Sequence, residues 1–154
     1  MELDVPALRE PERAHGELEP CAEELAARVL TGDALLMTSR RRVDGDTGEA
    51  SLDIARAVSA ALVDITRRAV ATSQVAWVVS KGGITSSDIA TEALGIARAT
   101  VLGQLFPGIV SVWVHEGGDA ADLQGLPYVV FAGNVGDDDS LAAAVSILRG
   151  AADA

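Results

Sequence analysis

The chain has 154 residues, enough for one domain with a hydrophobic core, and 49% of them are hydrophobic while only 3% are aromatic. Its formal net charge of −11 argues against a surface for nucleic acid or for an anionic membrane, because like charges repel. The single cysteine, Cys21, fits a reducing compartment, and no run approaches the ~20 apolar residues of a membrane helix. We therefore expect a cytoplasmic protein that forms a single domain over residues 1–154.

The first half of the chain has the pattern of two helices and two short strands. Residues 3–5 are expected to form a short strand, and the proline-punctuated stretch 6–20 a loop or partial helix. Apolar residues recur at helical spacing over 20–30 and again over 49–70, which predicts two helices. The apolar run 34–38 predicts a buried strand between these helices.

A glycine pair separates the next strand from the next helix. The run Val75–Val79 predicts a buried strand, and helical spacing predicts a helix over about 86–94 with Thr85 as its N-cap. Gly82 and Gly83 are therefore expected at a strand-to-helix turn, at the carboxyl end of a central strand.

Such a turn suits an anion. Backbone N–H groups without intrahelical partners and the positive end of the helix dipole meet there, and glycine lets a ligand approach the backbone closely. The functional interpretation is a phosphate cradle to which Lys81 adds a cation. On the pattern alone, a tight turn whose polar residues only cap the helix is favoured, because the sequence is neither a Walker loop nor a Gly-x-Gly-x-x-Gly fingerprint.

The second half of the chain adds further alternating elements. Strands are expected at 98–102, 110–114 and 128–131, and a last helix opens at the aspartates 137–139. Alternating strands and helices predict an α/β fold of three layers, with a mostly parallel or mixed sheet and helices on both faces. A second glycine turn, Ala132–Gly136, follows the strand at 128–131. Since parallel strands end at one edge, the two turns are expected to share one ligand site.

Residues typical of catalysis are sparse. Ser86 and Ser87 have only weak support as hydrolase nucleophiles, because no Gly-x-Ser-x-Gly elbow is present. His115 is expected at the surface or at the edge of the core. No cluster has zinc spacing. We therefore assign no catalytic residue and no metal ligand.

Three motifs in the second half occur in a characteristic order. They are Lys81–Thr91, then Leu102–Gln104 with Pro107-Gly108, then Leu126–Gly136. Together they resemble the C-terminal nucleotide-binding domain of the four-carbon acid sugar kinases, and the Gly-Gly-Ile-Thr-Ser-Ser-Asp version is most similar to the 3-oxo-tetronate kinase branch. A weaker match extends over residues 3–149.

This resemblance implies a role in carbohydrate metabolism. Members of the family transfer the γ-phosphate of ATP to the terminal hydroxyl of a four-carbon sugar acid, so ATP and Mg²⁺ are the implied cofactors. The residues implied to hold the ATP phosphates are Gly82, Gly83, Ile84 and Thr85, and those implied to complete the pocket are Gly133, Asn134 and Gly136.

The family's N-terminal acid-sugar domain and a serine-bearing loop have no counterpart in this sequence. We therefore expect an N-terminally truncated domain that is inactive alone and meets a sugar acid only with a substrate domain. One alternative is a non-catalytic nucleotide-binding or regulatory module. Another is a small stand-alone enzyme that uses Ser86 or Ser87. We also expect a homo-oligomer or a partner subunit, without nucleic acid or membrane as a partner.

Overall fold

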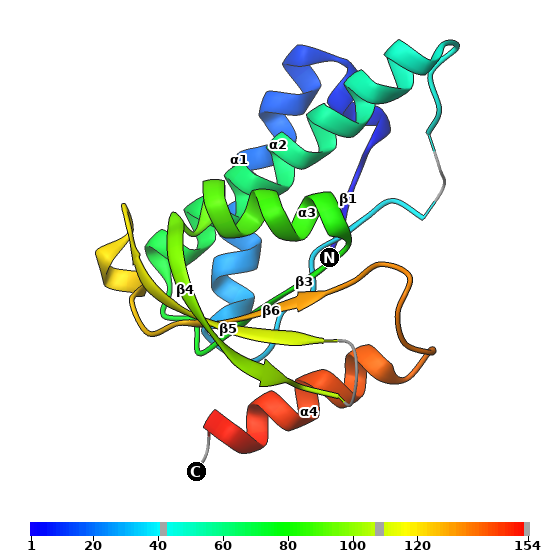
Figure 1. Cartoon of the computed structure of the whole chain (residues 1–154). Helices are drawn as coiled ribbons and strands as arrows, with labels where there is room; N and C mark the ends of the chain where they lie inside the picture. Colours follow the sequence, from blue (N-terminus) through cyan, green and yellow to red (C-terminus); the bar gives the residue numbers. More distant parts are fainter. Residues whose placement is uncertain (41–42, 107–109, 153–154) are drawn as a thin grey trace. The chain divides into compact units, whose positions relative to one another are not determined.

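The computed structural model describes residues 1–40, 43–106 and 110–152 (Figure 1). Within them, the chain forms two compact units, Met1–Gln74 and Val75–Ala154. The motif residues Pro107 and Gly108 lie outside the described residues.

Two long helices form most of the first unit. α1 spans Pro11–Val29 and α2 spans Gly48–Thr72, so the predicted second helix is confirmed. The Thr47 side chain caps α2 by accepting a hydrogen bond from the Ala50 N–H at 3.1 Å. The core of this unit consists of the buried residues Leu3, Ala22, Ala61 and Ile65.

Helix α1 is longer than the sequence predicts. A short 3₁₀ turn, η1 (Pro6–Arg9), precedes it, and α1 begins at Pro11 rather than near residue 20. Proline suits the first turn at Pro11, but Pro20 lies inside the helix, where it removes a hydrogen bond. Leu18 and Leu25, on either side of Pro20, pack against the core, and this burial offsets the loss.

The strands of the first unit are shorter than predicted. β1 (Glu2–Leu3) pairs in parallel with β2 (Met37–Thr38). The buried strand expected over 34–38 is thus reduced to its last two residues. The Met1 ammonium extends the pairing by donating to the Leu35 carbonyl at 2.8 Å.

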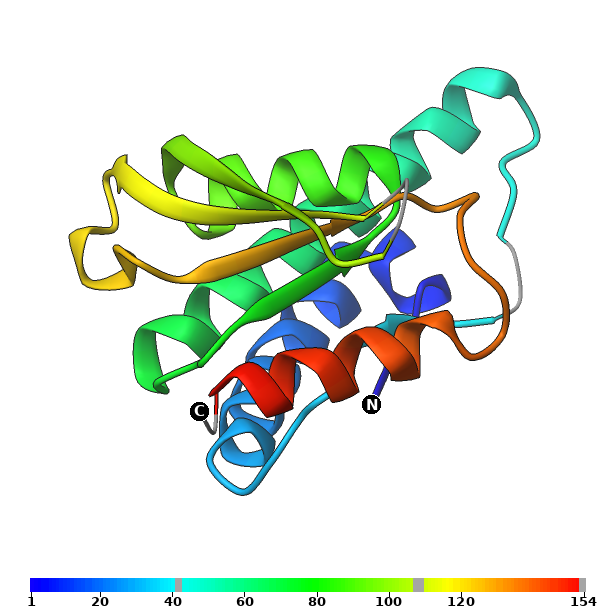
Figure 2. The ribbon, with the colours of Figure 1, turned by 60° about the horizontal axis from the view of Figure 1, so that its bottom comes forward.

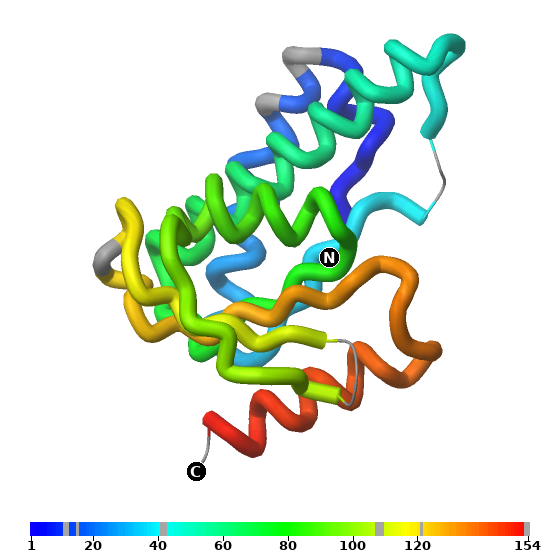
Figure 3. The backbone as a smooth tube through the Cα atoms, in the orientation of Figure 1, coloured from blue at the N-terminus to red at the C-terminus, as the bar shows by residue number. Residues whose placement is uncertain are grey.

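The second unit contains a mixed four-stranded sheet. Its strands are β3 (Val78–Lys81), β4 (Ile96–Gln104), β5 (Ser111–Gly118) and β6 (Pro127–Phe131), in the order β3-β6-β5-β4. β3 and β6 are parallel, and the other two pairs are antiparallel. β3 is therefore an edge strand among the described strands, not a central one as expected. After α3 (Gly83–Asp88) the chain crosses to the far edge, forms the β4–β5 hairpin and returns as β6, as the tube in Figure 3 shows.

Helices cover both faces of this sheet, which confirms the three-layer α/β prediction. α3 (Gly83–Asp88) continues into the π-helical segment η2 (Ile89–Ala93) on one face, and α4 (Ser140–Ala152) covers the other (Figures 1 and 2). On the α4 face, Ala144 and Leu148 pack against Val129 and Phe131. On the α3 face, the Tyr128 hydroxyl donates to the Ser86 carbonyl at 2.7 Å.

Candidate functional site

The first glycine turn joins β3 directly to α3. Gly82 has φ +121° and ψ 154°, a backbone conformation that residues other than glycine rarely adopt. Its N–H donates to the Phe131 carbonyl at 2.8 Å and so extends the β3–β6 pairing by one residue. Gly82 is therefore the position in this turn that requires glycine.

The N-cap of this helix lies three residues before the predicted one. Gly82 is the N-cap, no side chain caps the helix, and Thr85 lies inside the first turn of α3. The prediction of Thr85 as N-cap is wrong because the unusual backbone at Gly82 turns the chain straight from strand into helix. Gly83 is exposed, and a Cβ placed on it would meet no atom within 4 Å. Ile84 beside it is 77% exposed.

The two serines of the turn have different environments. Ser86 is buried, and its hydroxyl donates to the Ser80 carbonyl at 2.9 Å and also contacts the Gly82 carbonyl. Ser87 is exposed. The Ser86 hydroxyl thus ties the end of β3 to α3, which is a structural role and leaves that oxygen without access to a substrate.

The second glycine turn lies against the first. A Cβ built on Gly133 would come 3.4 Å from the Cα of Gly82, so the two turns lie side by side with room between them for little more than a methyl group. Gly136 has φ +84°, and a Cβ there would come 2.7 Å from the Ser140 side chain. The structure therefore brings Gly82 and Gly133, at the carboxyl ends of β3 and β6, close together. Whether one ligand occupies both turns stays a prediction.

Side-chain contacts fix the far end of the second turn. The Ser140 hydroxyl accepts from the Asp137 N–H at 2.8 Å, and Asp137 Oδ1 accepts from the Asp139 N–H at 3.2 Å. The hydrogen bond from the Ser140 hydroxyl holds the pKa of Asp137 below its ordinary value. These contacts start α4 at Ser140, just after the three aspartates predicted to open it.

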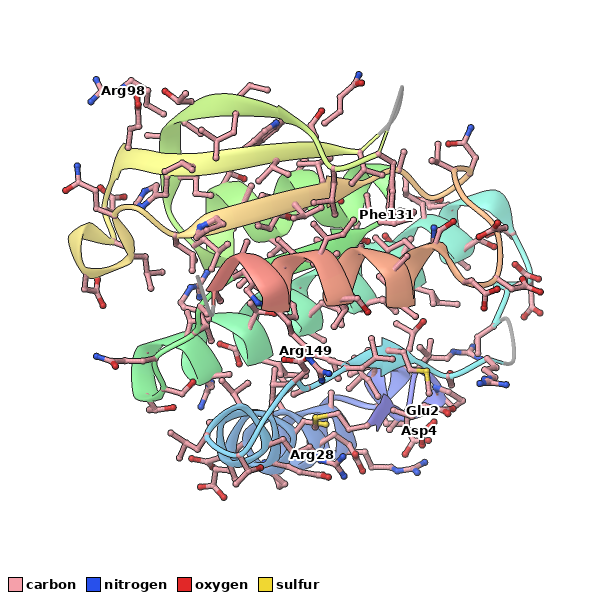
Figure 4. The ribbon with its side chains drawn as sticks, turned by 90° about the horizontal axis from the view of Figure 1, so that it is seen from below. Glu2, Asp4, Arg28, Arg98, Phe131 and Arg149 are labelled. Carbon is pink, nitrogen blue, oxygen red and sulfur yellow. The ribbon has the colours of Figure 1, made fainter. Side chains whose placement is uncertain are left out.

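Lys81 approaches the second turn rather than the start of α3. Its Nζ donates to the Val135 carbonyl at 3.1 Å and to the Ala132 carbonyl at 3.5 Å. It also lies 4.0 Å from the ring centroid of Phe131, which is labelled near α4 in Figure 4. The register of β3 against β6, which pairs Lys81 with Phe131, explains this direction, because paired residues of parallel strands project to the same face.

Tyr128 and His115 are buried on the sheet, and only the burial of the strand that holds Tyr128 was predicted from the sequence. Burial raises the pKa of Tyr128 to about 12. His115 is only 1% exposed, so its expected place at the surface or core edge is wrong, and neither ring nitrogen has a partner among the described residues. The sequence signal was the alternation in β5, which places His115 on the same face as Trp113. Trp113 packs near Tyr128, with ring centroids 6.3 Å apart.

Over residues 1–40, 43–106 and 110–152, no group of three His, Cys, Asp or Glu side chains could hold a metal ion. Mg²⁺ commonly binds through substrate phosphates together with one or two carboxylates, so a bound nucleotide would itself supply ligands. None of the helices in the described part of the chain is long and apolar enough to cross a membrane.

Comparison with known proteins identifies the family and the fold of this chain. The family model of the nucleotide-binding C-terminal domain matches residues 1–141. No curated protein matches the chain.

Several solved structures have the same fold. A domain of unknown function (DUF1537) from Bordetella bronchiseptica, a domain-swapped dimer with bound citrate, has a TM-score of 0.72 and 23% identity over 97% of this chain and 34% of that one. A putative tRNA synthase from Salmonella typhimurium LT2 has a TM-score of 0.65 and 22% sequence identity, over 94% of this chain and 34% of that one. A Haemophilus influenzae protein of the DUF1537 family has a TM-score of 0.63 and 20% sequence identity, over 96% of this chain and 34% of that one. This chain thus spans about a third of the length of these structures.

Proposed function

Because this chain belongs to the family of nucleotide-binding C-terminal domains, we propose that it binds ATP with Mg²⁺ where β3 and β6 end. The observation that carries the proposal is the close approach of Gly82 to Gly133, which brings two glycine turns together at the carboxyl ends of two parallel strands. In α/β sheets, ligands bind at such strand ends.

The residues of the first turn have the properties that a phosphate group needs. Gly83, Ile84 and Thr85 form the first turn of α3, where backbone N–H groups lack intrahelical acceptors and the dipole favours negative charge. The open space at Gly83 would let phosphate oxygens approach these amides. We propose that Gly133, Asn134 and Gly136 form the other side of the same site. A bound ATP would supply a transferable phosphoryl group, and Mg²⁺ would neutralise part of its charge.

We further propose that the chain acts as the ATP-binding part of a four-carbon acid sugar kinase, of the 3-oxo-tetronate type. Support comes from the three ordered motifs and from the family match. The chain spans 34% of the length of the Bordetella bronchiseptica relative, so we propose that the sugar-acid pocket lies in a separate substrate domain. Cytoplasmic location stays a prediction that rests on the single, free cysteine.

Calorimetric titration with ATP, in the presence and absence of Mg²⁺, tests the proposed ligand. We expect saturable binding that strengthens with Mg²⁺ and is much weaker for adenosine, since the proposed contacts are to phosphates. A Gly83→Val variant should lose most of this affinity. Absence of binding by a folded wild-type chain, or equal affinity for ATP and adenosine, would contradict the proposal.

We also propose that the chain associates with a second copy or a partner subunit. The Bordetella relative is a domain-swapped dimer, and the edge strand β4 exposes Val101 and Leu102 by 61% and 65%. Exposed strand edges and apolar patches commonly mark interfaces. Light scattering should show a mass above that of one chain, and Val101→Lys should lower it. A stable monomer at high concentration would count against association of the chain with itself.

A further inference from the structure

The side chain of Lys81 connects the two glycine turns. It belongs to the last residue of β3, directly before Gly82, yet its ammonium contacts the segment that follows β6. The partners are the carbonyls of Val135 at 3.1 Å and Ala132 at 3.5 Å and the ring of Phe131 at 4.0 Å. An ammonium has three donor hydrogens, and carbonyl oxygens and an aromatic face both attract its charge.

Among the described residues, few other hydrogen bonds hold the turn that Lys81 contacts. Within the turn, the Val135 N–H donates to the Ala132 carbonyl at a long 3.3 Å. Asp137 and Ser140 fix only its far end. Glycines at 133 and 136 give the backbone wide conformational freedom. Where the turn leaves β6, the Gly82 N–H holds the Phe131 carbonyl at 2.8 Å. Lys81 supplies the further tie that reaches Ala132 and Val135 within the turn.

We propose that Lys81 is a positioning residue for the nucleotide site: its ammonium holds the turn Ala132–Gly136 against Gly82 and is not itself a phosphate ligand. The competing interpretation is that Lys81 adds a cation to a phosphate cradle at the start of α3. In the structure, the ammonium is engaged by carbonyls of the second turn. The nucleotide part of this inference rests on the proposed function, whereas the tie to the turn does not.

Amide hydrogen exchange on the nucleotide-free protein tests the tie directly. Lys81→Met keeps most of the aliphatic stem and removes the ammonium. The Val135 N–H donates to the Ala132 carbonyl within the turn, so its exchange rate reports opening of the turn. We expect this rate to rise roughly three- to tenfold when the hydrogen bond from the Lys81 ammonium to the Val135 carbonyl is lost, as for one partly exposed hydrogen bond to a charged group. Lys81→Arg, which keeps a cation, should restore part of the protection. Unchanged exchange at Val135 in a folded Lys81→Met protein would overturn the proposal.

Arg98→Met is the matched control for the loss of a positive charge. Arg98 lies on the β4–β5 hairpin, away from Phe131 (Figure 4), and forms an ion pair with Glu116 at 3.8 Å. This variant should leave exchange at Val135 unchanged. Its ATP affinity also shows how much binding is lost when any one surface cation, with its long-range attraction for ATP, is removed.

The ATP affinity of Lys81→Met then separates positioning from direct contact. If the substitution only opens the turn, the apparent ATP affinity falls in proportion to the fraction of molecules whose turn stays closed. The fold-loss of ATP affinity should then be no larger than the fold-rise of the exchange rate at Val135. An affinity loss well beyond that factor would identify Lys81 as a ligand and overturn the proposal. If wild-type protein does not bind ATP, the proposed function fails, and the exchange experiment still decides the role of Lys81.

Discussion

Gly82 and Gly83 are adjacent, but only one of them needs glycine for folding. Gly82 has φ +121°, and Gly83 is the first residue of α3 with open space at its Cβ position. We predict that Gly82→Ala lowers the free energy of unfolding by about 1–3 kcal/mol through backbone strain. Gly83→Val should change it by less than about 1 kcal/mol yet weaken ATP binding at least tenfold, because its side chain would occupy the approach to the amides.

Denaturant unfolding and calorimetry on both variants check this pair. Gly150→Val is the matched control, because Gly150 also lies in a helix with no atom within 4 Å of a built Cβ. It should leave ATP affinity unchanged. Wild-type ATP affinity in a folded Gly83→Val protein would contradict the prediction.

Tyr128 makes stability depend on alkaline pH. Its pKa is raised from the ordinary 10.0 to about 12, so its stabilising contribution is complete below pH 10.0 and is lost as pH rises toward 12. The shift corresponds to about 2–3 kcal/mol. Tyr128 is the only tyrosine, so phenolate absorbance reports its titration alone. We expect a midpoint well above that of the unfolded chain, and Tyr128→Phe should remove the pH dependence. A Tyr128 titration midpoint near pH 10 in the folded protein would refute this prediction.

At the scale of elements, the junction of β3 with α3 depends on Ser86. Its buried hydroxyl contacts the carbonyls of Ser80 and Gly82, so Ser86→Ala should lower the free energy of unfolding by about 1–3 kcal/mol. The exposed Ser87 serves as control, and Ser87→Ala should fall within about 0.5 kcal/mol of wild type. Equal stabilities of the two variants in urea would show that the Ser86 contacts contribute little.

At the scale of the whole molecule, we predict that the chain assayed alone does not phosphorylate a sugar acid at a useful rate. Phosphoryl transfer requires the acceptor hydroxyl to be held in line with the γ-phosphate, and such positioning supplies about 7–11 kcal/mol of a barrier. The chain spans about a third of its solved relatives, and the proposed acceptor pocket lies in the remainder.

The assay mixes purified chain and Mg-ATP with 3-oxo-tetronate or erythronate and follows formation of a 4-phosphate product. Slow ATP hydrolysis is the most that we expect. Robust product formation without added protein would disprove the prediction, whereas activity that appears only on adding a separate substrate domain would support it.

Features that depend on local backbone geometry were predictable from the amino-acid sequence. Helical spacing predicted α2, which spans Gly48–Thr72, and the change of periodicity across Gly82 predicted a strand, a turn and a helix. The second glycine turn after β6 was also recognisable. Periodicity and turn residues report local conformation, which the chain near each residue decides.

Features that depend on pairing between distant segments could not be predicted in this way and became visible in the folded protein. Strand order made β3 an edge strand, and the register of Lys81 with Phe131 turned the ammonium toward the second turn. Packing carried α1 through Pro20 and buried His115. Such outcomes follow from hydrogen bonding and burial summed over residues far apart in sequence, and these energies override local preferences.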